Sequence, residues 1–216
     1  MAEKKEKYPV YISPKGVAKW AHLSVAQTMV GEKPVDPNFN VTVLLDPNDA
    51  TTIEFVEKIT KAHSEGLAAA KKAEPKKKLK DEGIGNMIQD DTNKDGEPTG
   101  KTAIKFKHKA SGVRRDKTEW SFRPALFDGA GVPLAPGTVV YGGSVLQVAY
   151  GIKHTVMPTG SFYTSLQLQA VMVSVLKSGF DRDASSYGFQ VETAEAQTAF
   201  GEEQVGEADG AASTDF

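Results

Sequence analysis

Between residues 101 and 117 the sequence carries a dense group of basic side chains. Seven lysines and arginines stand against Asp116 alone, so this stretch has a net charge of +6. In residues 104–109 (IKFKHK) lysine alternates with other side chains, and a β-strand would therefore place Lys105, Lys107 and Lys109 in a row on one face. Such a row can bind phosphates, although it also fits a strand face that is simply solvated. The basic pair Arg114 and Arg115 that follows favours phosphate binding.

Two aromatic residues could supply flat surfaces beside these cations. In residues 162–172, Tyr163 shares a face with small polar side chains, whereas the opposite face is apolar. An aromatic ring in such surroundings on the outside of a sheet is a candidate for stacking on a nucleobase. Trp20, next to Lys19, is a second candidate, but a tryptophan buried in the core fits its pattern equally well.

Motifs for catalysis or metal binding fail on spacing. Residues 96–102 (GEPTGKT) resemble a phosphate-binding P-loop, but three residues separate the glycines where four are needed. Residues 91–96 match the start of a calcium-binding loop, but Thr102 stands where a glutamate is required, which favours a polar turn over weak calcium binding. The four histidines lack ligand spacing and the sequence has no cysteine. We therefore expect no enzyme activity, no metal and no cofactor.

The charges divide the chain into two parts. Residues 181–216 carry nine acids and one base, a net charge of −8, and because the whole chain carries −2, residues 1–180 carry +6. This asymmetry is typical of nucleic-acid-binding proteins with an interaction tail, although solubility alone also explains it. We expect one folded domain over residues 1–180 and a disordered acidic tail over residues 181–216. No stretch has the apolar length of a signal peptide or a membrane span, which predicts a protein that is not exported.

The hydrophobic pattern predicts several strands and one long helix. Strands are expected within residues 16–45, with a loop at 33–37, and again at 101–110, 119–127, 144–154 and 162–176. Trp120 and Phe122 are assigned to the core. A helix is expected from a cap at Asp46 to about Ala73, with one apolar face against the strands, and residues 76–96 are expected to form a mobile loop. Without alternating β and α segments, the fold should be a small, mainly antiparallel β-barrel.

The order and spacing of several segments resemble the single-stranded DNA-binding proteins of tailed bacteriophages. The segments are 41–47 (VTVLLDP), the helix at 55–70, 104–107 (IKFK), 141–144 (YGGS), 166–172 (LQLQAVM) and 215–216 (DF). The resemblance covers nearly the whole chain. It implies an OB-fold barrel with an inserted helix, sequence-tolerant binding of single-stranded DNA in replication, recombination and repair, and a tail that contacts a polymerase, primase or helicase. It also implies homodimers in some relatives and the cytoplasm of an infected bacterial host as the location.

The residues expected to contact DNA lie on several strands. They are Lys19, Trp20, Lys105, Lys107, Lys109, Arg114, Arg115, Tyr150, Lys153 and Tyr163. Tyr150 and Lys153 are included through the resemblance. A relative can have lysines at the positions of Gln147 and Ala149, and Tyr150 and Lys153 are the candidates that this strand retains. In the tail, Asp209, Asp215 and Phe216 are expected to bind the partner, and the tail's negative charge is expected to compete with DNA for the basic domain.

Two other functions fit the same features. An RNA-binding or RNA-chaperone OB-fold module would carry the same barrel and charges. A structural phage protein could carry the charges only for solubility.

Overall fold

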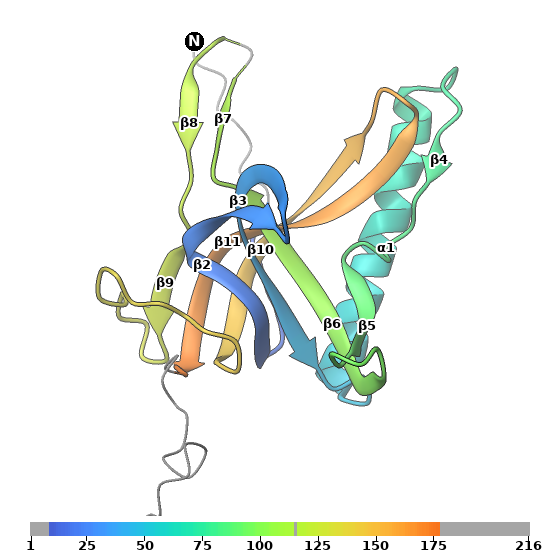
Figure 1. Cartoon of the computed structure of the whole chain (residues 1–216). Coiled ribbons are helices and arrows are strands. Elements are labelled where there is room, and N and C mark those ends of the chain that lie inside the picture. The colour runs from blue at the N-terminus through green and yellow to red at the C-terminus, as the bar shows by residue number, and fades with distance from the viewer. Residues whose placement is uncertain (1–8, 115, 178–216) are drawn as a thin grey trace, which may run out of the picture. The chain divides into compact units, whose positions relative to one another are not determined.

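The computed structural model describes residues 9–114 and 116–177 (Figure 1). Arg115 and the predicted tail, with Asp209, Asp215 and Phe216, lie outside the described residues, so what was expected of them stays a prediction. Within the described part of the chain, no helix has the length and apolar character needed to cross a membrane.

Five long strands close into a barrel. They are β2 (Gly16–Val30), β3 (Lys33–Leu45), β6 (Pro98–Lys109), β10 (Val145–Val156) and β11 (Ser161–Val175). The pairing runs from β10 to β2, β3, β6 and β11 and then back to β10. All of these pairs are antiparallel except β6 and β11, which are parallel. This order is that of an OB fold and confirms the predicted, mainly antiparallel barrel.

The interior of the barrel is filled by every second side chain of these strands. Ile104, Phe106, Leu146, Val148, Leu166 and Leu168 are at most 1% exposed. Removing each such side chain from water stabilises the fold by roughly 1.5–3 kcal/mol. The alternation read from the sequence therefore follows the real division between interior and exterior on β6, β10 and β11.

Tyr150 belongs to this core, which corrects the expectation that it contacts DNA. Its side chain is fully buried, and its ring packs against Tyr11, Phe55 and Phe106 at centroid distances of 5.7, 5.7 and 5.4 Å. Burial raises the pKa of its hydroxyl to about 12, because the charged phenolate would lose its hydration. On β10, Tyr150 lies on the same face as Leu146 and Val148, so the strand's own period argues for the core.

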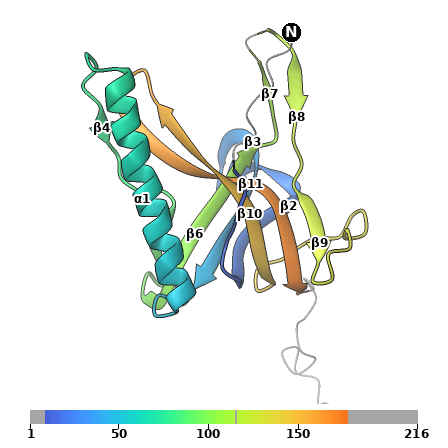
Figure 2. The same ribbon diagram turned by 180° about the vertical axis from the view of Figure 1, so that it is seen from behind.

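The helix α1 (Ala50–Ala73) lies in the chain between β3 and β6, as the resemblance implies, and runs along one side of the barrel (Figure 2). Its N-cap is Asp49 rather than the predicted Asp46: the Asp49 carboxylate accepts a hydrogen bond from the Thr51 N–H at 2.9 Å. Phe55 and Ile59 are buried against the barrel. Ile53 is 46% exposed, because at about 100° per residue it points well away from that stripe.

Two segments predicted as loops contain strands. Residues 76–96 include β4 (Lys80–Asp81), parallel to β11, and β5 (Ile88–Thr92), antiparallel to β6. They form through backbone pairing and expose most of their side chains, so the apolar pattern is too sparse to predict them. Residues 33–37 are the start of β3, because a tight turn at Gly31, with φ of 58°, lets Val30 pair with Lys33.

The predicted strand at 119–127 is divided between two sheets. β8 (Glu119–Ser121) pairs with β7 (Ser111–Val113) in a hairpin that stands clear of the barrel in Figure 1, whereas β9 (Ala125–Asp128) pairs with β11. Trp120 is therefore a half-buried residue of the hairpin, 5.8 Å from the His108 ring, and not a core residue. Phe122, beyond the hairpin, packs against the core as expected. A short strand β1 (Tyr11–Ile12) adds to β10.

Candidate nucleic-acid interface

The three lysines of β6 lie in a row on the outside of the barrel. Their neighbours Ile104 and Phe106 are fully buried, whereas Lys105, Lys107 and Lys109 are exposed. The predicted division of this strand into an apolar face and a lysine face is confirmed. The strand β6 itself carries no acidic residue, so any neutralisation of this row comes from other strands or from a bound anion.

The surroundings of the lysine row change the pKa of its members. Burial and the charges of Lys105 and Lys109 lower the pKa of Lys107, against an opposing effect of Asp36. Lys109 forms an exposed ion pair with Asp36 at 2.8 Å, which lowers the pKa of that carboxyl. Exposed pairs of this kind contribute little to stability, because water screens them, so a phosphate can replace Asp36 at little cost.

Polar residues of β3 border the lysine row and were missed from the sequence. In the antiparallel register Asn38 lies opposite Lys109 and Asn40 opposite Lys107. The Asn40 side-chain amide donates hydrogen bonds to Gln27 Oε1 and Asn38 Oδ1, both at 2.8 Å, which fixes the two amides beside the lysines. Asn38 is 1% exposed and Asn40 is 5% exposed, so these amides join β3 to Gln27 of β2 and offer no contact surface to a ligand.

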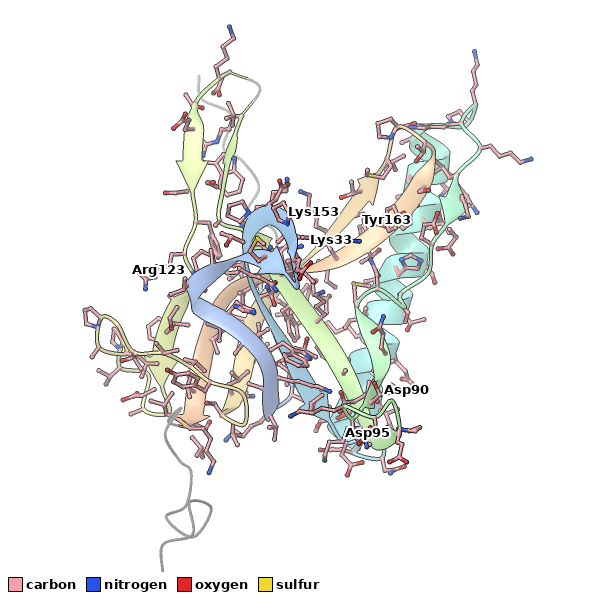
Figure 3. The ribbon with its side chains drawn as sticks, viewed as in Figure 1. Lys33, Asp90, Asp95, Arg123, Lys153 and Tyr163 are labelled. Carbon is pink, nitrogen blue, oxygen red and sulfur yellow. The ribbon has the colours of Figure 1, made fainter. Side chains whose placement is uncertain are left out.

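The β10–β11 hairpin forms an arm that carries Lys153 and Tyr163 (Figure 3). Lys153 is exposed and Tyr163 is half-buried. Lys153 pairs with Ser165 and Tyr163 with Thr155, and the bridge between Leu166 and Phe106 joins the base of the arm to β6. The arm therefore continues from the strand that bears the lysine row.

A polar cluster around the buried His63 and Thr164 fixes the arm to α1. Thr164 Oγ1 lies 2.7 Å from His63 Nδ1 and 2.9 Å from His154 Nδ1, and His63 Nε2 lies 2.9 Å from Asp81 Oδ1. His63 is thus a hydrogen-bonded core residue, as the sequence indicated. Burial, followed by the neighbouring His63, lowers the pKa of His154, which favours the neutral ring. The cluster positions the backbone of Tyr163, the residue next to Thr164.

Trp20 is on the surface, which excludes the core interpretation, while its stacking on a base stays a prediction. Its side chain is 67% exposed and its φ is 55°, a left-handed conformation that costs a non-glycine residue about 1–3 kcal/mol. The register between β2 and β3 shifts between Lys19 and His22, so a bulge turns Trp20 outward.

Lys19 is engaged within the protein. Its ammonium group forms an ion pair with Asp91 at 2.5 Å and donates to the Thr92 carbonyl at 2.8 Å. Asp91 is buried, yet these contacts and the hydroxyl of Thr99 hold its pKa below the usual value. Lys19 therefore ties β5 to β2 and has less freedom to bind phosphate than the lysines of β6.

The predicted basic pair that follows β6 is only partly described. Arg114 is exposed on the β7–β8 hairpin, and Arg115 lies outside the described residues.

Solved structures of two other proteins have a similar fold. The structure is similar to that of gp2.5, a single-stranded DNA-binding protein encoded by bacteriophage T7, with a TM-score of 0.60 and 21% sequence identity, covering 87% of this chain and 97% of that one. A single-stranded DNA-binding protein from bacteriophage Enc34, in complex with single-stranded DNA, matches with a TM-score of 0.51 and 18% identity, covering 79% of this chain and 89% of that one. The chain has the fold of phage single-stranded DNA-binding proteins. Neither a scan against protein-family models nor a search of curated proteins finds a match.

The first prediction concerns the lysine row. Changing Lys105, Lys107 and Lys109 together to alanine should weaken binding to all single strands alike, and should reduce the slope of log affinity against log salt by roughly 0.7 for each phosphate that is no longer neutralised. Fluorescence titration over a range of salt concentrations measures this slope. Removing three exposed lysines of α1 instead (Lys61, Lys71 and Lys72) is the matched control and should leave the slope nearly unchanged. If both variants have the slope of the unmodified protein, the β6 lysines only face solvent.

The second prediction concerns the arm. Tyr163→Ala should weaken DNA binding by about 1–3 kcal/mol, because one base loses its stacking partner, while Tyr163→Phe keeps the ring and should bind normally. Affinity and thermal unfolding measured together separate this role from a structural one. A large fall in melting temperature at unchanged affinity would assign Tyr163 to packing.

Proposed function

We propose that the protein binds single-stranded DNA with little dependence on sequence, and that it protects and organises DNA during phage replication and recombination. The observation that carries the proposal is the lysine row on the outside of an OB barrel, bordered by the arm with Lys153 and Tyr163 and by the exposed Trp20. Lysines release counterions from phosphates, and aromatic rings stack on any base, so neither contact depends on base identity. That both phage proteins of this fold are single-stranded DNA-binding proteins supports the proposal.

We further propose that residues 181–216 regulate the interface and contact a polymerase, primase or helicase in the cytoplasm of an infected bacterium. The support is the charge of −8 on this segment against +6 on residues 1–180. Carboxylates compete with phosphates for the same cations, and bound DNA would release the segment. Asp209, Asp215 and Phe216 are proposed as the residues that the partner binds.

A homodimer is also proposed, through the outer face of β10 and β11. Ile12, Phe127, Ala149, Ala170, Val171 and Met172 line an uncharged hollow of about 280 Å³ there, together with Gln147. Ile12 is 60% exposed and Met172 is 38% exposed, and burying such side chains favours association. A second copy of the chain can cover this face in a two-fold arrangement. Sedimentation of the full chain is the test, and a monomer at every concentration would overturn this proposal.

An RNA-binding or RNA-chaperone role is the alternative, because the same charges and rings would hold RNA. Titration with single-stranded DNA, matched single-stranded RNA and duplex DNA at low salt decides between them. We expect single-stranded DNA to bind more tightly than duplex DNA, because the rings can stack only on unpaired bases. Equal affinity for RNA and DNA would favour the alternative, and absence of binding to all three would leave the charges with a role in solubility alone.

The tail gives a further prediction. Deleting residues 181–216 should tighten DNA binding, most strongly at low salt, because competing carboxylates are removed and salt screens their effect. Full-length protein with the nine acids changed to their amides should bind as tightly as the deletion, which separates charge from chain length. Phe216→Ala should leave DNA affinity unchanged and weaken binding to the replication enzyme. Weaker DNA binding after the deletion would contradict the competition.

A further inference from the structure

The exposed indole of Trp20 forms one wall of a hollow on the outside of the barrel. The hollow has a volume of about 280 Å³ and lies between β2, β3, β6 and β5, the strand on which Figure 3 labels Asp90. Its lining includes Lys19, Trp20, Thr42, Gln89, Asp91 and Lys105. Pockets for drug-sized ligands usually measure about 300–1,000 Å³, so this one has the size for a single planar ring system. It opens beside Lys105, the first lysine of the β6 row.

The side of the hollow formed by β5 presents hydrogen-bond acceptors. The Gln89 amide nitrogen donates a hydrogen bond to the Gly85 carbonyl at 2.6 Å, which fixes the orientation of the amide. The amide oxygen, Oε1, is a hydrogen-bond acceptor. Asp91 is 6% exposed and already accepts hydrogen bonds from Lys19 and Thr99, so it supports the wall and does not meet a ligand. The Gln89 amide lines the hollow, so a ring held against Trp20 with its edge toward β5 meets the Gln89 acceptor.

We propose that this hollow takes one nucleobase of a bound single strand and prefers a base with an exocyclic amino group over thymine or uracil. The inference rests on the proposed binding of single-stranded DNA and goes beyond it, because it makes one position of the interface sensitive to base identity. Lys105 neutralises the phosphate, the Trp20 indole stacks on the base and Gln89 Oε1 accepts the amino hydrogen. Adenine, cytosine and guanine each carry that amino group. Thymine and uracil carry a carbonyl oxygen in place of that amino group, which Gln89 Oε1 repels, and their only donor on this edge is the N3–H.

The test compares two oligonucleotides of equal length, one of deoxycytidine and one of deoxyuridine. Their rings have the same size and differ at position 4, where one has an amino group and the other a carbonyl oxygen, and at N3, which carries a hydrogen only in uracil. The full-length protein should bind the deoxycytidine strand up to about tenfold more tightly, the upper end of what one net hydrogen bond contributes. A thymidine strand should match deoxyuridine, which removes the methyl group as a cause.

Variants of Gln89 and Trp20 assign the discrimination to the hollow. Gln89 is exposed, so Gln89→Leu should fold normally, bind deoxyuridine as before and lose the preference for deoxycytidine. Gln89→Glu keeps an acceptor and should keep the preference, whatever its added charge does to both strands. Trp20→Ala should weaken both by on the order of tenfold through loss of stacking.

Each result separates this inference from the function on which it rests. Equal affinity of the unmodified protein for the two strands, or a preference that survives Gln89→Leu, overturns the base-reading hollow while leaving DNA binding intact. Failure to bind either strand overturns the proposed function itself.

Discussion

Closure of the barrel determines which side chains can meet a nucleic acid. Because β11 pairs with both β6 and β10, the sheet has one enclosed face, and every second residue of each strand must fit inside it. A slip of one residue on β6 would move three lysines into a space now filled by Ile104 and Phe106. Burying unpaired cations costs far more than any exposed interaction returns, so the register is strongly specified. The lysine face is thus a consequence of the core.

The cations on this face are not equivalent. Among the described residues, Lys105 and Lys107 form no ion pair, Lys109 has one exposed partner, and Lys19 is held by the buried Asp91 and a backbone carbonyl. Releasing Lys19 would leave a buried carboxylate without its counter-charge, a penalty of several kcal/mol, whereas releasing Lys109 costs almost nothing. The three lysines of β6 are therefore freer than Lys19 to take up the proposed phosphate contacts, and Lys19 serves the shape of the surface by joining β5 to β2.

Long periodic signals were predictable from the sequence, and local departures from them were not. The alternation over β6 and β11 and the apolar stripe of α1 extend over many residues, so single errors average out. Trp20 could not be placed, because alternation assumes an unbroken strand and the bulge after Lys19 reverses the facing. β5 was not predicted, because it is held by backbone pairing with β6 and backbone pairing leaves no pattern of residue types in the sequence. Tyr150 was the avoidable error, because its own strand placed it with core residues and only the resemblance argued otherwise.

Tolerance of sequence and recognition of one base can coexist on the same surface. In the proposed function, phosphate contacts along β6 and stacking on Tyr163 would act on every nucleotide alike and supply most of the affinity. The proposed edge contact in the Trp20 hollow would add about 0.5–1.5 kcal/mol at one position. A strand without a suitable base still binds through the other contacts, so coverage of the DNA is preserved. What would change is the position of the protein along the DNA, because binding would be tighter where an amino-bearing base can enter the hollow.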